Sequence, residues 1–273
     1  MLRAMRTHAL LVINPSSGDD SPTAAELAQA AGAQGVETHL LAKGEDPGEV
    51  ARAAGAEIVG MAGGDGSLAA VAAVALDTDA AFVCVPFGTR NHYARDVGLD
   101  RSDPLAALAA FGSGVERRID VGRVNGRIFL NNVSLGVYAG LVHRRERHRR
   151  RGEALARARG LLAVAHHRHR LRVRVNGEEL VARVLLVGNN RYEVSLFTLG
   201  ERARLDGSEL QLWAAAGVLP TAWEERVGPQ FTIELPESTV RAAIDGEPAV
   251  LDSPLRLESS PKALRVLLPL AQG

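Results

Sequence analysis

The stretch EIVGMAGGDGSLAAVAAVAL, residues 57–76, places a glycine-rich turn between two apolar runs. Residues 57–62 have the length and the Ile/Val content of a buried strand, and residues 67–76 are alanine-rich like a helix. The turn itself is Gly63-Gly64-Asp65-Gly66-Ser67. Glycines permit positive φ and close backbone approach, and a helix start attracts anions through its N–H groups and dipole. The turn therefore predicts a phosphate site; the alternative is an ordinary tight strand-to-helix turn.

The same alternation continues on both sides of this stretch. The expected strands are residues 9–13, 36–41, 57–62 and 80–86, and the expected helices are residues 23–31, a segment starting at Asp46-Pro47, residues 67–76 and residues 102–111. Strands that alternate with helices form a parallel sheet covered on both faces. Residues 1–120 are thus predicted to be a Rossmann-like or phosphofructokinase-like α/β domain.

A different pattern begins near residue 120. Asn125-Gly126 lies between extended runs at residues 115–124 and 127–133, and Asn176-Gly177 lies between runs at residues 171–175 and 179–187. An Asn-Gly pair in such a place is the strongest short hairpin signal. Further short runs of strand character follow, interrupted by one helical stretch over residues 136–167. We expect residues 121–273 to form a mostly antiparallel β-sandwich domain, with a cleft between the two domains and a last strand that can return to the first.

Composition excludes several classes of function. The 273 residues carry a formal net charge of zero and only 4% aromatics, which argues against nucleic-acid binding. The single cysteine, Cys84, lies in an apolar run and is expected in the core. The first apolar run ends at Asn14-Pro15, too short for a signal peptide, and no run reaches the ~20 residues that span a bilayer. We therefore expect a cytoplasmic protein, with any membrane contact peripheral at the inner face.

Two more loops follow predicted strands, Asn14-Pro15-Ser16-Ser17-Gly18 and Pro86-Phe87-Gly88-Thr89-Arg90-Asn91. Ligands of open α/β sheets bind at the carboxyl ends of the strands, where these loops fall. The sequence has neither Gly-x-Gly-x-x-Gly after the first strand nor a Walker A motif, and its only lysines are Lys43 and Lys262. Phosphates must therefore be held by backbone N–H groups, hydroxyls, arginine and metal.

In this order and spacing the three loops resemble the diacylglycerol kinase/sphingosine kinase family of lipid kinases, and the resemblance extends over residues 9–268. Further matching segments are Ile119-Asp120-Val121-Gly122, Asn132-Val133-Ser134-Leu135-Gly136 and Asp245-Gly246-Glu247-Pro248. The resemblance implies two domains, ATP and Mg²⁺ as cofactors, and phosphoryl transfer to a lipid hydroxyl.

The resemblance also implies roles for individual residues. Asp65 and Asp120 would belong to the magnesium–water network, and Glu247 would be the general base that takes the proton of the acceptor hydroxyl. Asp65 would also count among the catalytic residues. The nucleotide would be contacted by Asn14, Pro15, Ser16, Ser17, Gly18, Gly63, Gly64, Asp65, Gly66, Ser67, Thr89, Arg90, Asn91 and His92.

The sequence departs from the family pattern at three places. His92 stands where the family usually has Asp, so an imidazole replaces one carboxylate of the metal network. Arg90 adds a cation where a small residue is usual. The Asp-Asp-Gly turn that holds a second magnesium in some relatives is reduced to Asp206-Gly207 here, which weakens the case for that second site. Together these departures raise the alternative of an altered substrate or a weakened activity.

An Arg/His-rich stretch covers residues 143–170, with ten Arg and five His. A solvated helix face is one interpretation. The other is a dock for anionic lipid headgroups, where each basic residue contributes ~1 kcal/mol.

Two rival functions stay open. A soluble-substrate kinase similar to NAD kinase shares the Gly-Gly-Asp-Gly turn but lacks the other two loops. A nucleotide-binding protein with little turnover is the rival from another class, motivated by His92.

Overall fold

The computed structural model of the chain describes residues 7–18, 22–88, 91–136, 170–195, 198–199, 201–216 and 223–270. The chain divides into two compact units. The first comprises Met1–Ile119 and Lys262–Gly273, and the second comprises Asp120–Pro261. The chain passes between them within two strands, β5 (Val115–Val124) and β18 (Leu255–Leu268).

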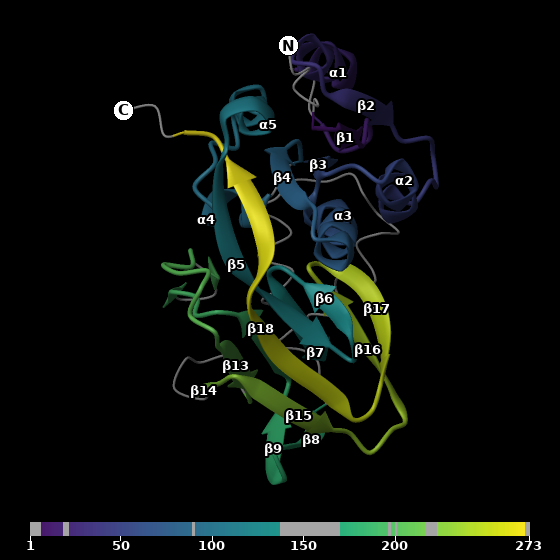
Figure 1. Cartoon of the computed structure of the whole chain (residues 1–273). Helices are drawn as coiled ribbons and strands as arrows, with labels where there is room; N and C mark the ends of the chain where they lie inside the picture. The colour runs from purple at the N-terminus through teal and green to yellow at the C-terminus, as the bar shows by residue number, and fades with distance from the viewer. Residues whose placement is uncertain are drawn as a thin grey trace. The chain divides into compact units, whose positions relative to one another are not determined.

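A parallel sheet forms the centre of the first unit (Figure 1). Its strands lie in the order β2 (Glu37–Leu40), β1 (Ala9–Ile13), β3 (Ile58–Gly63) and β4 (Ala81–Pro86). The end of β18 adds a fifth parallel strand, with Val266 opposite Phe82. The predicted parallel α/β arrangement is confirmed.

Helices cover both faces of this sheet, because every strand in its centre is apolar on both sides. Leu11 and Ile13 point to one face, where they pack with Leu27 of α1 (Ala24–Ala33) and with Leu108 of the 3₁₀ helix η1 (Ala106–Ala109). The opposite face is covered by α2 (Pro47–Ala54), α3 (Asp65–Thr78) and α4 (His92–Asp96).

The helix starts follow local capping chemistry. Asp46 accepts hydrogen bonds from the N–H groups of Gly48 and Glu49, and Pro47 occupies the first turn of α2, as predicted. The prediction of a helix over residues 102–111 is wrong for the first part of that range. There the Asp103 carboxylate accepts the Ala106 N–H, a 3₁₀ turn follows, and the α-helical part α5 is only Ala110–Ser113.

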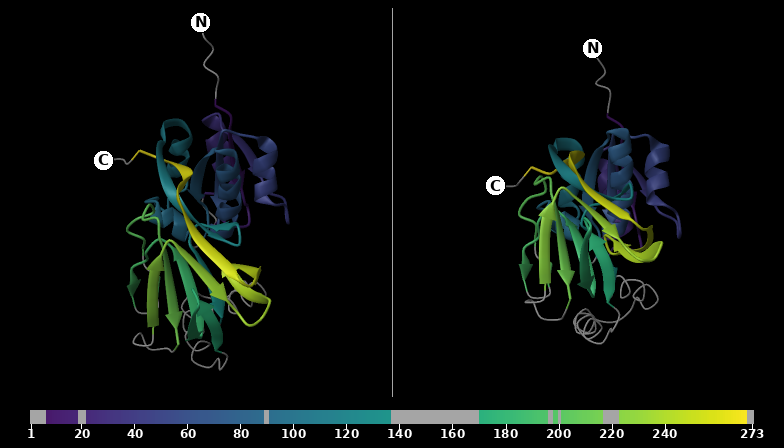
Figure 2. Two further views of the ribbon diagram at one scale, coloured as in Figure 1. Left: turned by 60° about the horizontal axis from the view of Figure 1, so that its bottom comes forward. Right: turned by 90° about the horizontal axis from the view of Figure 1, so that it is seen from below.

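The second unit consists of two antiparallel layers. In Figure 2 the strands of one layer run side by side, and they are hydrogen-bonded in the order β14-β13-β10-β7-β16-β17. Their bounds are β14 (Trp223–Gly228), β13 (Leu210–Ala215), β10 (Val184–Asn189), β7 (Asn132–Gly136), β16 (Thr239–Ile244) and β17 (Glu247–Asp252). The short strands β11 (Val194–Ser195) and β12 (Thr198–Leu199) form a separate pair.

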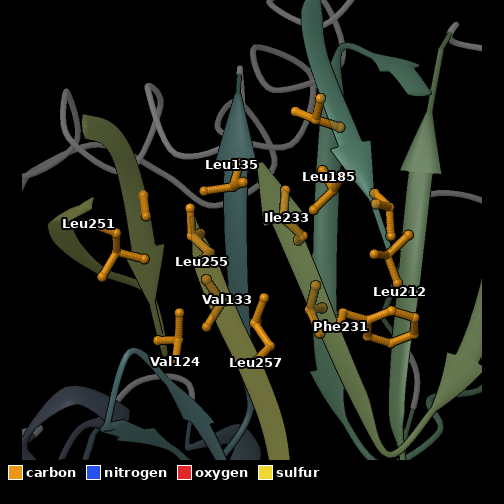
Figure 3. Close-up of a cluster of buried hydrophobic side chains, with 14 of the residues drawn as sticks. Val124, Val133, Leu135, Leu185, Leu212, Phe231, Ile233, Leu251, Leu255 and Leu257 are labelled. Carbon is orange, nitrogen blue, oxygen red and sulfur yellow. The ribbon is translucent and has the colours of Figure 1, made fainter. Parts of the chain in front are cut away.

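The other layer joins the first half of β18 to β15 (Gln230–Glu234), β8 (Leu171–Val175) and β9 (Glu178–Ala182). On its other side β18 pairs with β5, and β5 pairs with β6 (Arg127–Phe129). Alternate side chains of both layers point inward and form one apolar core. Figure 3 shows Val133, Leu185 and Leu212 of one layer facing Ile233 and Leu257 of the other. This is the predicted β-sandwich.

Two strands predicted as continuous are divided in the structure. Residues 127–133 form β6 and β7, which belong to different layers, and residues 179–187 form β9 and β10 in the same way. The strand β17, which contains Pro248, was not among the expected strands. It lies at the edge of its sheet, where proline costs no ladder bond. The helix expected over residues 136–167 falls almost wholly outside the described residues.

Within the described residues no helix is both long and apolar enough to cross a membrane.

Candidate active site

Three loops meet at one edge of the parallel sheet because they follow adjacent strands. β1, β3 and β4 are neighbours in the sheet, and their carboxyl ends lie at the same edge. The loops that follow them are Asn14–Gly18, the Gly63–Ser67 turn and the segment after Pro86. The predicted nucleotide-contacting loops of the first unit are thus brought together, except that Thr89 and Arg90 lie outside the described residues.

The first loop is a compact turn built by Asn14. Its side-chain oxygen accepts the Ser16 N–H at 3.0 Å, and its carbonyl accepts the Ser17 N–H at 3.1 Å. The Asn14 N–H donates to the Ala62 carbonyl at 2.9 Å, which ties the loop to β3. At Gly18 an added Cβ would lie 2.1 Å from the Phe87 ring, so only glycine fits against the third loop.

The second and third loops touch through their backbones. A Cβ added at Gly88 would lie 3.0 Å from the Cα of Gly64 and 3.2 Å from its nitrogen. The fully buried Asn91 holds this arrangement by donating from Nδ2 to the Gly88 carbonyl at 2.7 Å. Among the residues that the structure describes, Asn91 Oδ1 has no hydrogen-bond partner, so a buried acceptor remains here for a donor from a ligand.

Asp65 holds the start of α4. Its carboxylate accepts the backbone N–H groups of His92 at 3.3 Å and Tyr93 at 3.2 Å, and its Oδ2 lies 3.5 Å from Nδ1 of His92. Burial raises the pKa of Asp65, but the His92 side chain and these two N–H groups outweigh it and hold the pKa below its usual value. Asp65 is therefore an ionised residue that fixes the third loop to the second.

The start of α3 offers an anion site of its own. Gly64 is the N-cap residue. Because glycine has no side chain, no capping group at this position binds the first N–H groups of the helix. An anion is stabilised at such a position by the N–H groups and by the helix dipole. His92, which is 47% exposed, adds a side chain that can donate to the same anion.

Cys84 is not part of this chemistry. It is 1% exposed in β4, and burial, followed by the charge of Asp65, raises the pKa of its thiol well above the usual value. The predicted role as a core residue is confirmed.

In the second unit, Asp245 rather than Glu247 is buried. The Asp245-Gly246 turn has positive φ at both residues, 49° and 85°, as a two-residue hairpin turn between β16 and β17 requires. The Asp245 carboxylate accepts three backbone N–H groups, from Leu130 and Asn131 at 2.7 Å and from Asn132 at 3.0 Å. Glu247, the next residue but one, is exposed at the start of β17.

Asp120 and Asp206 also lie in the second unit. Asp120 is 1% exposed and accepts the Ser208 N–H at 2.6 Å, so it binds the loop that carries Asp206. Asp206 itself accepts a hydrogen bond from Arg204 at 3.2 Å. Among the described residues, no three His, Cys, Asp or Glu side chains are grouped so that they could hold a metal ion. A magnesium ion here would rest on one or two carboxylates, water and phosphate oxygens, which is its usual coordination beside a nucleotide.

A groove of about 580 Å³ lies elsewhere in the first unit, lined by Ile58, Ala81 and Arg265 among others. Ile58 and Ala81 are the first residues of β3 and β4. The groove is therefore at the amino ends of these strands, away from the three loops.

Comparison with known proteins agrees with this arrangement. The family model of the diacylglycerol kinase catalytic domain matches residues 8–124. A diacylglycerol kinase of Bacillus subtilis is 33% identical over 132 residues, which cover 45% of this chain and 44% of that enzyme. A protein of Pseudomonas aeruginosa described as a YegS-like lipid kinase is 31% identical over 251 residues, covering 81% of this chain and 80% of the relative. The crystal structure of a diacylglycerol kinase from Bacillus anthracis superposes with a TM-score of 0.72 at 18% identity, covering 98% of both chains, and this likeness shows the fold alone.

A parallel sheet with an uncapped helix start at its strand ends, followed by a β-sandwich, defines with these matches a kinase built on that catalytic domain. The chain belongs to the diacylglycerol kinase family of lipid kinases.

The sequence did not predict which contacts hold the turn before Glu247 in place. Asp245 was noted only as a neighbour of Glu247, and the clamp it makes on residues 130–132 was not foreseen. The Asp-Gly pair signals a hairpin turn, but no local pattern reveals a bond between residues more than a hundred positions apart.

Replacing Asp65 by Asn tests its role at the start of α4. The variant loses the charge opposite His92 and one strong acceptor for the two N–H groups. We expect a loss of about 0.5–2 kcal/mol in the free energy of unfolding, the range for a lost helix cap, measured by urea denaturation. ATP affinity with Mg²⁺, measured by calorimetry, should fall at least ~10-fold because the loops separate. Asp77→Asn is the control, since Asp77 is an exposed carboxylate of the same helix. Unchanged ATP affinity in Asp65→Asn would contradict the assignment.

Gly88→Ala tests the backbone contact between the loops. The new Cβ would lie 3.0 Å from the Gly64 Cα and 3.2 Å from its nitrogen, so the backbone of one loop must shift by a few tenths of an ångström. We expect ATP affinity to fall by about 3–10-fold while the circular dichroism spectrum is kept, because small misplacements in a preorganised site are costly. Gly112→Ala is the control: no atom lies within 4 Å of its added Cβ, and alanine favours the helix. Equal ATP affinity in the two variants would show that the contact has no role in binding.

Proposed function

We propose that this protein transfers the γ-phosphoryl group of ATP to a hydroxyl group of a lipid similar to diacylglycerol. The observation that carries the proposal is the backbone contact of the Gly63–Ser67 turn with Gly88 beside the open start of α3, an arrangement that suits a chain of phosphate groups. Membership of the family supports phosphoryl transfer, and the names of the Bacillus subtilis and Pseudomonas aeruginosa relatives support a lipid acceptor.

The roles of the residues follow from their chemistry. The loops Asn14–Gly18 and Gly63–Ser67 and the residues Thr89, Arg90, Asn91 and His92 contact the nucleotide. Among these, Asn91 Oδ1 is an acceptor without a protein partner, and His92 can donate to a phosphate oxygen. Asp65 keeps the loops in register and belongs with Asp120 to the groups that accept hydrogen bonds from metal-bound water.

Glu247 is the general base. It is exposed, whereas Asp245 beside it is buried and occupied by three N–H groups. As the acceptor oxygen bonds to the γ-phosphorus, its proton passes to the Glu247 carboxylate, and the bond from that phosphorus to the bridging oxygen breaks to release ADP. When Mg²⁺ is bound it neutralises charge that develops on the phosphate oxygens.

A panel of acceptors tests the reaction. The purified protein is incubated with radiolabelled ATP, Mg²⁺ and mixed micelles that contain dioleoylglycerol, a monoacylglycerol or a long-chain base, with NAD as a soluble alternative. We expect label in the organic phase. Label on NAD would favour the soluble-substrate kinase, and ATP binding without transfer to any acceptor would favour a nucleotide-binding protein.

Glu247→Gln should lower turnover by ~10²–10⁴-fold, the scale of a lost general base, and leave ATP affinity within about twofold. Glutamine keeps the size of the side chain but cannot take a proton. Glu237→Gln, at another exposed position of the second unit, should leave turnover unchanged. Turnover above about a tenth of wild type in Glu247→Gln would mean that another group is the base.

A further inference from the structure

A buried network of polar groups surrounds residues 130–132 in the second unit. All six of their backbone N–H and C=O groups have protein partners. Asp245 binds both sides of the segment, since its carboxylate accepts the three N–H groups and its own N–H donates to the Asn132 carbonyl at 2.9 Å. The turn that carries Glu247 is thus fixed to this segment.

The two remaining carbonyls of the segment are bound from the other side. The Leu130 carbonyl accepts Arg202 Nη1 at 2.6 Å and Asn189 Nδ2 at 3.3 Å. The Asn131 carbonyl accepts the Asn189 N–H at 2.9 Å and the Tyr192 hydroxyl at 3.0 Å. Asn189 is 1% exposed and Arg202 is 4% exposed, so these bonds are shielded from competition by bulk water.

Asn189 extends the network to Asp120. The same Nδ2 that binds the Leu130 carbonyl also donates to the Asp120 carbonyl at 3.0 Å. The Asp120 carboxylate then accepts the Ser208 N–H, and the next side chain along, Asn190, accepts the Gly207 N–H at 2.9 Å. One amide group therefore connects the segment under Glu247 with the segment that carries Asp120.

A gain in the stability of the second unit does not by itself explain this buried polar network. The unit already has a continuous apolar core, and the structure gives Asn189 Oδ1 no hydrogen-bond partner although it is buried, which costs free energy. Buried polar groups that are costly and directional fix geometry more than they add stability. A general base must be held within about 0.5 Å of its productive position, and a hairpin turn by itself does not provide that precision.

We propose that Asn189 is a positioning residue that couples the placement of Glu247 to that of Asp120. The proposal rests on the proposed function, because it assumes that Glu247 takes part in the reaction. Asn189 acts through the backbone of residues 130–132 and through Asp245. Arg202 and Tyr192 support the same segment.

The test is a double-mutant cycle of Asn189→Ala with Glu247→Gln, assayed with ATP, Mg²⁺ and dioleoylglycerol micelles. In the wild-type background we expect Asn189→Ala to lower kcat by ~10–100-fold and to change the KM for ATP by less than about threefold. In the Glu247→Gln background the loss should be at least ~3-fold smaller, because one of the two groups that Asn189 positions, Glu247, is already inactive. An equal loss of kcat in both backgrounds would overturn the proposal.

Hydrogen exchange supplies a readout that does not depend on activity. Amide exchange in peptides that contain residues 119–124 and 244–248 should accelerate together in Asn189→Ala. Asn125→Ala is the matched control, since the Asn125 side chain also joins two backbone groups of this unit, accepting the Arg256 N–H and donating to the Asp252 carbonyl, both at 2.8 Å, outside the network. It should accelerate exchange near residues 125 and 252–256 but not in the peptide of residues 244–248, and it should leave kcat unchanged. Unchanged exchange in Asn189→Ala would overturn the coupling between the Glu247 and Asp120 segments. Normal turnover in Glu247→Gln would instead refute Glu247 as the general base, and the exchange result alone would then decide whether Asn189 couples the two segments.

Discussion

The close backbone approach of Gly64 and Gly88 shapes the edge of the sheet at which we propose that the first unit binds the nucleotide. A side chain at Gly88 would press against Gly64, and a side chain at Gly18 would meet Phe87, so the three loops can close on one another only because these positions are glycine. Asp65 then fixes the third loop to the second through two N–H groups of α4. The open start of α3 remains directed at the same edge of the sheet, and the anion site follows from this packing rather than from any one cationic side chain.

Much of this arrangement could be read from the sequence, because local rules decide it. Apolar runs of strand length, the N-cap at Asp46 and the order of three loops after three strands lead to a parallel sheet whose ligand edge carries those loops. The register that puts Gly64 against Gly88 could not be read, since it depends on how adjacent strands pair. Nor does spacing indicate that the carboxylate of Asp65 binds the backbone of His92 and Tyr93 in another loop.

The second unit was less predictable for a physical reason. Residues 127–133 and 179–187 each look like one strand, because apolar residues lie on both sides of the point where the chain changes layer. At the first of these points the backbone bonds of residues 130–132 go to Asp245, Asn189, Arg202 and Tyr192, which come from distant parts of the sequence. Side chains can take the place of strand-to-strand hydrogen bonds only when the folded chain brings them next to the backbone groups concerned. A pattern within ten residues does not contain that information.

The acidic residues of the segments that match the kinase family fall into a buried group and an exposed one, and the two groups suit different chemistry. Asp65, Asp120 and Asp245 are each nine-tenths buried or more, and each accepts backbone N–H groups from another part of its own unit. At Asp65 these bonds help to hold the pKa below its usual value, and all three carboxylates are placed to hold loops and to accept hydrogen bonds from metal-bound water. Glu247 is exposed, and a base must reach the hydroxyl that it deprotonates. Its place directly after the clamped Asp245-Gly246 turn gives an accessible carboxylate a rigid support, which is the combination that general-base catalysis requires.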